Sequence, residues 1–358
     1  LSANILKILG VFAENQKKFY KSIIFVLSNK KEEVRMSERD IKVQAIINPI
    51  SGVGSKRKIP KMIEGICSKK NCSLNISFTE YAGHASELTR QAIEEGAEYI
   101  LAVGGDGTVN EIARAMIHSN AILGIIPKGS GNGLARELHI PMDVKRAIDL
   151  IAKGHVTTID CCRANGQVFF CTCGVGFDAA VSQKFANEKR RGSLTYIKNT
   201  IEEYLSYKPE PYELVVDNQT IKEKAFLVAC ANASQYGNNA FIAPHANIQD
   251  GRMDVTILSP FMPLDIAPLA IQLFTKQIDR NSKIKTMKAQ QVTIIRQHPG
   301  VMHLDGEPIM ADRRIDITVE PKALHVLTPE VVSFTKEVHN LFDEVTRFFD
   351  KKLPYIFK

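Results

Sequence analysis

The chain lacks any long apolar run, any internal repeat and any two cysteine pairs at zinc-binding spacing. No stretch approaches the roughly 18 consecutive apolar residues of a membrane-spanning helix, so no such helix is expected. The seven cysteines are odd in number and lie partly inside apolar runs, which favours reduced thiols and a cytoplasmic protein. Cys171 and Cys173, in the run VFFCTCGVG, have no second pair at zinc spacing, so we expect no metal there.

Positive charge exceeds negative charge by a modest margin. The 46 Lys and Arg residues against 39 Asp and Glu residues give a net charge of +7. This excess favours anionic partners such as phosphates, nucleotides, nucleic acid or an acidic membrane surface. A length of 358 residues predicts two domains. Residues 1–40 are of uncertain status, because the first methionine is Met36; they are either an upstream extension or a short helical appendage.

Between residues 41 and 154, short apolar strands alternate with helical stretches. This alternation predicts an α/β domain in which a parallel sheet carries helices on both faces. Ligands of such sheets bind beyond the carboxyl ends of the strands, and the Gly-rich turns of this chain follow the expected strands. The expected strands are 43–47, 74–78, 99–103 and 122–126, and the expected helices are 59–67, 87–95 and 109–118.

Between residues 155 and 328, strand-like runs dominate and predict a second, mainly antiparallel β domain. Asn165-Gly166 separates two such runs and is typical of a two-residue hairpin turn. Residues 329–358 are expected to form a C-terminal helix that packs back on the body, because apolar residues recur there at helical spacing. Helices are also expected at 177–203 and 263–275, and further strands at 212–216, 225–230, 253–258, 291–295, 315–319 and 324–327.

The stretch LAVGGDGTVNEIA, residues 101–113, places one carboxylate among three glycines after a strand. Thr108 to Glu111 has the form of a capping box, which accounts for those two residues only. Successive glycines let backbone N–H groups approach a phosphate at the positive end of a helix. Asp106 would repel that phosphate unless a divalent cation or a substrate hydroxyl lay between them. We therefore interpret the stretch as half of a phosphoryl-transfer site.

Two other Gly-rich turns stand at the same expected edge of the sheet. NPISGVGSK lacks the Gly-Lys-Ser/Thr ending of a Walker A loop, but Asn48, Ser51 and Gly52 make a hydrogen-bonding turn suited to a nucleotide. The third turn, PKGSGNGLAR, supplies polar donors among glycines at Lys128, Ser130 and Asn132. Three such turns at one edge favour a phosphate site over three unrelated turns.

Taken in order, these turns resemble the diacylglycerol kinase catalytic domain family, which includes soluble bacterial lipid kinases and the sphingosine and ceramide kinases. The resemblance continues to later motifs and covers about residues 41–328. It implies an ATP-binding α/β domain, a β-rich second domain and an active site between them. The motifs that carry it are 48–52 (NPISG), 104–108 (GGDGT), 127–132 (PKGSGN), 174–179 (GVGFDA), Asp250-Gly251 and 305–307 (DGE).

The resemblance also implies roles for single residues. It gives ATP contacts to Asn48, Pro49, Ile50, Ser51, Gly52 and Thr79, a phosphate cradle to Gly104, Gly105, Asp106, Gly107, Thr108, Val109, Asn110 and Glu111, and completion of the pocket to Ser130. Asp305 and Glu307 match the acidic pair from which the base is drawn, with Asp106 as a further catalytic candidate, and the sequence leaves open which of the pair is the base. Asp250 matches a magnesium ligand, aided by the carbonyls of Asn247 and Arg252. The residues alone also fit simple turns at 305–307 and 250–251.

The implied reaction transfers the terminal phosphoryl group of ATP, with Mg2+, to a lipid hydroxyl. Family members often carry Asn-Asp in the third motif, whereas Gly133 follows Asn132 here; this leaves the substrate open between diacylglycerol and a sphingoid base or ceramide. The expected partners are a membrane lipid and the membrane surface, with no nucleic acid and a possible homodimer. The stretch PFMPLDIAPLAIQLF suits bilayer docking or, equally, a buried core helix. Alternatives are an NAD kinase, which shares the Gly-Gly-Asp-Gly turn, and a catalytically silent lipid-binding protein.

Overall fold

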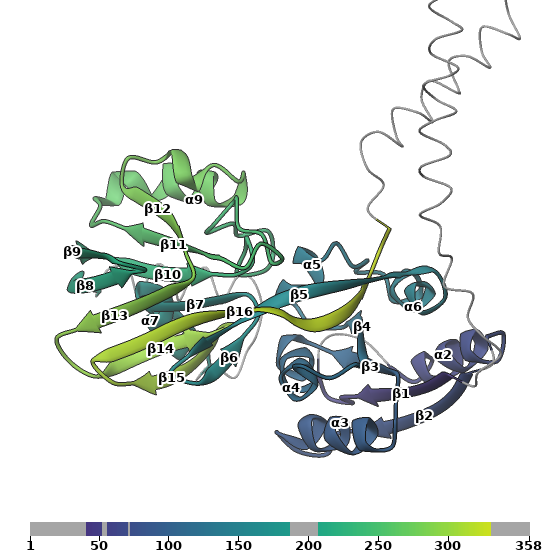
Figure 1. Ribbon diagram of the computed structural model, residues 1–358. Helices are drawn as coiled ribbons and strands as arrows, with labels where there is room; N and C mark the ends of the chain where they lie inside the picture. Colours follow the sequence, from purple (N-terminus) through teal and green to yellow (C-terminus); the bar gives the residue numbers. More distant parts are fainter. Residues whose placement is uncertain (1–40, 52–55, 71, 187–206, 331–358) are drawn as a thin grey trace, which may run out of the picture. The chain divides into compact units, whose positions relative to one another are not determined.

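The computed structural model of the chain describes residues 41–51, 56–70, 72–186 and 207–330 (Figure 1). Contacts divide the chain into Leu1–Asp40 and Ile41–Lys358, and every described residue belongs to the second unit. The expected N-terminal extension, Gly52 and the expected C-terminal helix after Glu330 therefore lie outside the described residues.

Four parallel strands form one end of a ten-stranded sheet, and they alternate with helices as the sequence predicts. They are β1 (Ile41–Ile47), β2 (Cys72–Phe78), β3 (Tyr99–Gly104) and β4 (Ile122–Pro127). Their order is β2-β1-β3-β4, and each neighbouring pair is parallel. Because all four strands run the same way, their carboxyl ends meet at one edge of the sheet.

Helices cover both faces of this sheet. In Figure 1, α3 and α4 lie together on one side and α2 and α6 on the other, and contacts join each pair. The helices are α2 (Ile59–Cys67), α3 (His84–Glu94), α4 (Asp106–Met116), α5 (Gly133–Glu137) and α6 (Val144–Lys153). The sequence did not predict α6, whose first turn is capped by the Asp143 carboxylate accepting the Arg146 N–H at 2.9 Å.

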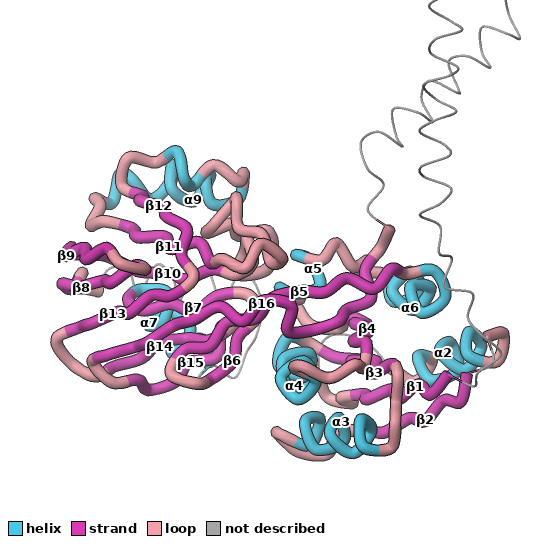
Figure 2. Tube along the Cα trace, in the orientation of Figure 1, coloured by secondary structure: helices cyan, strands magenta, loops and turns pink. Residues whose placement is uncertain are grey.

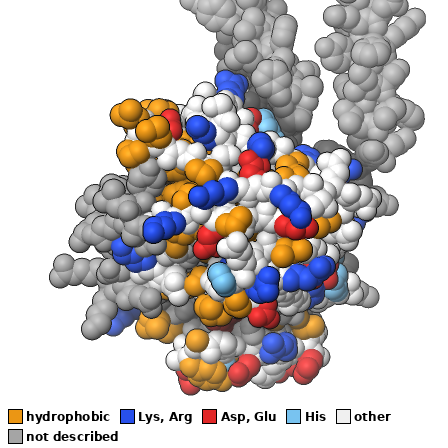
Figure 3. Space-filling view, turned by 90° about the vertical axis from the view of Figure 1, so that its left-hand side faces the viewer, with side chains coloured by type: hydrophobic (Ala, Val, Ile, Leu, Met, Phe, Trp, Pro, Cys, Tyr) orange, Lys and Arg blue, Asp and Glu red, His pale blue; other side chains and the backbone are white. Residues whose placement is uncertain are grey.

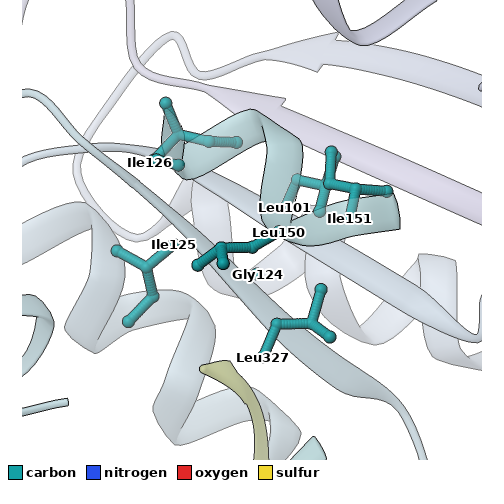
Figure 4. Close-up of a pocket in the computed structure, with 8 residues that line it drawn as sticks. Leu101, Gly124, Ile125, Ile126, Leu150, Ile151 and Leu327 are labelled. Atoms are coloured by element: carbon teal, nitrogen blue, oxygen red, sulfur yellow. The ribbon is translucent and has the colours of Figure 1, made fainter. Parts of the chain in front are cut away.

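Aliphatic side chains fill the space between α6 and the sheet. Figure 4 shows Leu150 and Ile151 of α6 facing Leu101 of β3 and Leu327 across Gly124 of β4. The remaining gap has no room for a water molecule. A Cβ on Gly124 would come within 2.5 Å of the Leu101 Cδ2 atom, so this glycine is required by packing.

The rest of the described chain is mainly antiparallel strand, shown in magenta in Figure 2. Every strand pairing among these later strands is antiparallel, so the predicted fold class is confirmed: a parallel α/β region followed by an antiparallel β region. The strands are β5 (His155–Ala164), β6 (Gln167–Phe169), β7 (Thr172–Gly176), β8 (Glu210–Val216), β9 (Gln219–Ala225), β10 (Leu227–Ala231), β11 (Met253–Leu258), β12 (Ile284–Ala289), β13 (Gln291–Arg296), β14 (Gly300–Leu304), β15 (Glu307–Ala311) and β16 (Arg314–Thr328).

Two long strands connect the parallel and antiparallel regions. β16 pairs with β5 along most of its length, and its last residues pair in parallel with β4 at Ile122 and Leu123. The first half of β5 and the second half of β16 belong to the apolar core under the parallel sheet, through Ile159 and Val326. The boundary expected between residues 154 and 155 stays a prediction.

Short helices complete the β region. They are α7 (Phe177–Ala186), the 3-10 turn η1 (Pro263–Asp265), α9 (Ile266–Phe274) and the 3-10 turn η2 (Ile278–Arg280). The second part of the helix expected over residues 177–203 lies outside the described residues. Within the described ranges, no helix is both long and apolar enough to cross a membrane.

Strands β9, β12, β14 and β15 were not predicted from the sequence. β9 reads QTIKEKA and buries only Ala225 fully, because most of its residues face solvent. β12 reads IKTMKA and buries only its two ends. Neither segment shows an apolar run, because each is held by pairing with a neighbouring strand rather than by burial of its own side chains.

Candidate active site

Three turns follow the carboxyl ends of β1, β3 and β4. Backbone bonds tie them to one another: the Asn48 N–H donates to the Val103 carbonyl at 3.0 Å, and the Lys128 N–H donates to the Gly104 carbonyl at 2.7 Å. The first bond joins the turn after β1 to β3, and the second joins the turn after β4 to β3. The structure therefore brings the three motifs together at one edge of the sheet, as their order in the sequence predicts.

The first turn is organised by the side chain of Asn48. Its Oδ1 atom accepts the N–H groups of Ile50 and Ser51, both at 3.1 Å, and its Nδ2 atom donates to the Thr108 Oγ1 atom at 3.0 Å. The buried Lys56 ammonium group donates to the carbonyls of Ser51 and Pro49. Burial and the nearby Lys128 lower the pKa of Lys56, so two cationic side chains lie beside the turn.

The helix that follows the second turn begins earlier than the sequence suggested. α4 starts at Asp106 with Gly105 at its N-cap, and no side chain caps it. The capping box expected over Thr108 to Glu111 is therefore wrong, because Thr108 lies inside the first turn with its hydroxyl bonded to Asn48. The N–H groups of the first turn of α4 are left for another acceptor, which is the arrangement that binds anions at helix N-termini.

The second and third turns interlock through Asp106 and two glycines. The Asp106 carboxylate accepts the Asn132 N–H at 2.8 Å and the Gly133 N–H at 2.6 Å. A Cβ on Gly129 would lie 2.7 Å from the Gly105 Cα atom, so the two backbones approach as closely as glycine permits. The contact between the two turns thus explains Gly105, and the two N–H groups that Asp106 accepts explain its carboxylate.

The aspartate of the 305–307 motif accepts hydrogen bonds from the backbone of residues 170–172. Asp305 and Gly306 form the two-residue turn between β14 and β15, with φ of +51° and +83°. The Asp305 carboxylate faces inward and accepts the N–H groups of Phe170, Cys171 and Thr172 at 2.9, 2.7 and 3.0 Å. Burial raises the pKa of Asp305, while the three N–H groups and Arg114 oppose that shift.

Glu307 differs from both aspartates, because no backbone N–H group is bonded to its carboxylate among the contacts of the described chain. Its side chain is 51% exposed, and one carboxylate oxygen lies 3.4 Å from the Arg114 Nη1 atom of α4. The other oxygen would lie 3.6 Å from a Cβ on Gly107. Arg114 also keeps two buried nitrogens, Nε and Nη2, without a hydrogen-bond partner in the described part of the protein. Glu307 is therefore next to the first turn of α4, with a half-exposed carboxylate that faces Arg114.

The residues expected to bind magnesium do not fit a magnesium ion. One Asp250 oxygen lies 2.8 Å from the Lys288 ammonium group, and the other accepts the Arg252 N–H at 3.1 Å. The Asn247 carbonyl accepts the Asp250 N–H at 3.2 Å. A lysine thus supplies the positive charge that a cation would bring. Elsewhere in the described ranges, no three His, Cys, Asp or Glu side chains gather closely enough to hold a metal ion.

The remaining predicted site residues lie on the same edge of the parallel sheet. Thr79 follows β2 and is buried, with its N–H bonded to the Ile47 carbonyl at 3.0 Å. Val109 and Asn110 are buried in the first turns of α4, and Glu111 accepts the Ser86 hydroxyl on its carbonyl. Pro49, Ile50 and Ser130 are exposed at the turns.

Sequence reasoning missed Lys56, Arg114 and a buried polar group in the β region. Arg114 is seven residues after Gly107, so helical spacing puts the two on one face of α4, but no sequence signal links that face to Glu307. In the β region, Asp178 lies 3.1 Å from the His303 Nε2 atom and accepts the Tyr236 hydroxyl at 3.0 Å. The Gly306 N–H lies 3.3 Å from the other ring nitrogen of His303, so this group supports the turn that carries Glu307.

Two family models match the chain along its length. The diacylglycerol kinase catalytic domain matches residues 42–164, and the YegS C-terminal NAD kinase beta sandwich-like domain matches residues 171–328. A diacylglycerol kinase of Mycobacterium tuberculosis is 30% identical over 301 residues, which cover 80% of this chain and 95% of that protein. A Pectobacterium atrosepticum protein named "Probable lipid kinase YegS-like" is 29% identical over 273 residues, covering 74% and 89% of the two chains.

A solved structure supports the fold. The crystal structure of a diacylglycerol kinase from Bacillus anthracis superposes with a TM-score of 0.64 at 22% identity. The match covers 81% of this chain and 98% of that chain.

Proposed function

Because the chain belongs to the diacylglycerol kinase catalytic domain family of lipid kinases, which use ATP, we propose that it transfers the terminal phosphoryl group of ATP to the hydroxyl of a membrane lipid. One observation carries the proposal beyond family membership. Three Gly-rich turns and the first turn of α4 converge at one edge of a sheet, and an available carboxylate, Glu307, lies beside them.

We propose that the α/β region binds ATP at these turns. The uncapped N–H groups at the start of α4 and the cationic side chains of Lys56 and Lys128 supply the donors and positive charge that a triphosphate requires. Asn48, which is half-buried and bonded to both its own turn and Thr108, fixes the position of the first turn relative to α4. Asp106, expected to be catalytic, holds the third turn in place for the nucleotide.

Glu307 is the proposed base. It is exposed and, among the described residues, bound only to Arg114, whereas the oxygens of Asp305 already accept three backbone N–H groups. A lipid alcohol is a poor nucleophile, so a carboxylate that accepts its proton as the phosphoryl group arrives accelerates the reaction. Asp305 then acts through the backbone, by fixing the turn from which Glu307 projects. Arg114 orients the Glu307 carboxylate.

Magnesium enters the proposal with ATP rather than through Asp250. A divalent ion that accompanies the triphosphate neutralises charge on its oxygens during transfer. The pairing of Asp250 with Lys288 argues against a second ion there.

The proposed lipid is diacylglycerol or a sphingoid base. Gly133 takes the place of the aspartate that many family members carry, and a Cβ at this position would lie 3.7 Å from the Asp106 Oδ1 atom. A carboxylate at residue 133 would therefore approach Asp106 closely, in surroundings where such a Cβ also lies 3.4 Å from the Tyr236 carbonyl oxygen and 3.7 Å from the Cys171 Sγ atom. We assign residues 41–154 to nucleotide binding and residues 155–328 to the lipid.

Incubation with labelled ATP and a panel of acceptors tests the proposal. Diacylglycerol, sphingosine and ceramide are presented in mixed micelles with magnesium, and NAD is presented in solution. We expect label on one lipid and none on NAD. Label on NAD alone identifies an NAD kinase, and no label on any acceptor with retained lipid binding identifies a catalytically silent lipid-binding protein; either result contradicts the proposal.

A further inference from the structure

Residues 262–274 expose an unusual number of large apolar side chains. Five of the ten large hydrophobic residues exposed in the described chain belong to this stretch. Leu264 is 86% exposed, the highest exposed fraction among these five residues. We call this set the α9 apolar surface, and its members are Met262, Leu264, Ile266, Ile271 and Phe274.

Only a narrow stripe of α9 packs into the hydrophobic core. Leu269 is the one fully buried side chain of the helix, and Leu273 and Phe261 are partly buried beside it. The helix has no charged residue, and its single amide side chain, Gln272, accepts the Asn281 amide at 2.7 Å. The alternative of a buried core helix is therefore wrong: the stretch is apolar all round, yet most of it faces outward. Figure 3 shows hydrophobic side chains gathered at the upper edge of the face that it views.

The residues that follow α9 are positively charged. Lys276 and Arg280 are exposed, and the Lys276 ammonium group lies 4.3 Å from the centre of the Phe241 ring. Two acidic residues lie nearby: one oxygen of Asp265 accepts the Met262 N–H at 2.9 Å, and one oxygen of Asp279 lies 3.3 Å from His245, while the other Asp279 oxygen has no hydrogen-bond partner among the described residues. An apolar face with exposed cationic side chains at its border matches the boundary between anionic headgroups and acyl chains.

We propose that the α9 apolar surface inserts into the headgroup region of an anionic lipid bilayer, with Lys276 and Arg280 on the phosphates. The proposal rests on the proposed function, because the acceptor lipid of that reaction resides in a bilayer. A folded partner protein is a poorer match, because α9 offers no free polar side chain to give a protein partner direction. Docking through α9 holds the β region, assigned to the lipid, at the membrane surface.

Sedimentation with vesicles tests the proposal on the full chain. Vesicles of phosphatidylcholine are compared with vesicles that also contain phosphatidylserine. We expect Ile271→Glu and the pair Lys276→Glu/Arg280→Glu each to weaken binding to the anionic vesicles by about tenfold or more. The matched controls are Val156→Glu, an exposed apolar residue of β5, and Lys69→Glu/Lys70→Glu, an exposed basic pair after α2; both should bind like the wild type.

Activity on two forms of lipid separates this proposal from the proposed function. The Ile271→Glu variant should phosphorylate a short-chain lipid in detergent at the wild-type rate and lose rate only on vesicles. If the wild type phosphorylates neither the short-chain lipid nor the vesicle lipid, the proposed function is contradicted. The vesicle-binding measurement then still decides whether α9 docks on a membrane. Unchanged vesicle binding by both α9 variants overturns docking through α9.

Other occupants give different results. If a second copy of the chain covers α9, Ile271→Glu converts a dimer into a monomer on a sizing column. If residues 331–358 cover it, their removal increases binding to vesicles. Either result overturns the proposal.

Discussion

The edge of the parallel sheet and the β14–β15 turn each carry an aspartate that sequence alone would assign to chemistry. In both places backbone N–H groups donate hydrogen bonds to the carboxylate: Asp106 accepts two N–H groups and Asp305 accepts three. The regions differ in what stands next to the aspartate. Beside Asp106 are glycines and N–H groups that favour an anion. Two residues after Asp305 stands Glu307, which is exposed and pairs with Arg114 alone in the part of the chain that the structure describes.

This difference distinguishes two aspartates that hold backbone segments in place from a glutamate that is proposed to accept the proton of the lipid hydroxyl. Both aspartates accept N–H groups of segments that are distant in the sequence, 26 and 27 residues away for Asp106 and 133 to 135 residues away for Asp305. The longer side chain of Glu307 extends beyond the turn to α4. The comparison assigns nucleotide binding to one region and proton removal to the other, and the following variants are designed to break that assignment.

The largest effect is expected from Glu307→Gln. The amide keeps the size of the side chain but cannot accept the proton of the lipid alcohol, so turnover should fall by about 10²–10⁴-fold. The Kd for ATP and the urea midpoint should stay at wild-type values. Glu213→Gln is the matched control, since the half-buried Glu213 also pairs with a cationic side chain, 3.1 Å from Lys222 in β9; it should keep full turnover.

Asp305→Asn should cost stability. The neutral amide is a weaker acceptor for three inward-facing N–H groups, and we expect a loss of about 2–4 kcal/mol in the free energy of unfolding. Asp217→Asn is the control, because Asp217 begins the similar β8–β9 turn with φ of +50° but accepts two N–H groups at an exposed site. Urea unfolding of both variants checks the difference, and equal losses would contradict the structural role given to Asp305.

Gly129→Ala should weaken ATP binding. The added methyl group meets the Gly105 backbone, so the second and third turns must separate and the N–H groups of the site move apart. We expect the Kd for ATP to rise about tenfold, equivalent to about 1.4 kcal/mol. Gly65→Ala in α2 is the control, because no atom lies within 4 Å of its added methyl group. A Gly129→Ala protein that binds ATP normally would show that the close approach of the turns is not required.

The smallest effect concerns Lys56 and pH. Its ammonium group is charged below its pKa, and burial together with Lys128 lowers that pKa from the ordinary value of 10.5. Affinity for ATP should therefore fall by a few-fold as pH rises through this lowered pKa, because the neutral amine no longer attracts the phosphates. Lys128→Met should move the fall to higher pH, and Lys56→Met should remove it. Titration of ATP binding in alkaline buffers checks all three proteins; a fall of the same size in Lys56→Met would exclude Lys56 as its source.

The fold class and the grouping of the three turns were predictable from the sequence. Apolar runs of about five residues alternate with amphipathic stretches, and parallel strands must end at one edge. The polar strands β9 and β12 were not predictable, because pairing rather than their own pattern holds them.

The contacts between side chains within the site could not be predicted from the sequence. Arg114 and Glu307 are 193 residues apart, and Asp250 and Lys288 are 38 residues apart. No local spacing encodes either pair, since each depends on how separate elements pack. The roles of Asp305 and Glu307 could not be separated in sequence for the same reason: the three N–H groups that occupy Asp305 come from residues 170–172.

Total turnover, measured together with the folded fraction for Asp305→Asn and Glu307→Gln over a range of temperatures, tests the central claim most directly. The account predicts that cooling, which restores the folded fraction of Asp305→Asn, brings its turnover to within about tenfold of the wild type, while Glu307→Gln stays at least about 10²-fold lower at every temperature. If fully folded Asp305→Asn is as inactive as Glu307→Gln, or if Glu307→Gln keeps near-full turnover, the division between structural aspartates and a catalytic glutamate is contradicted.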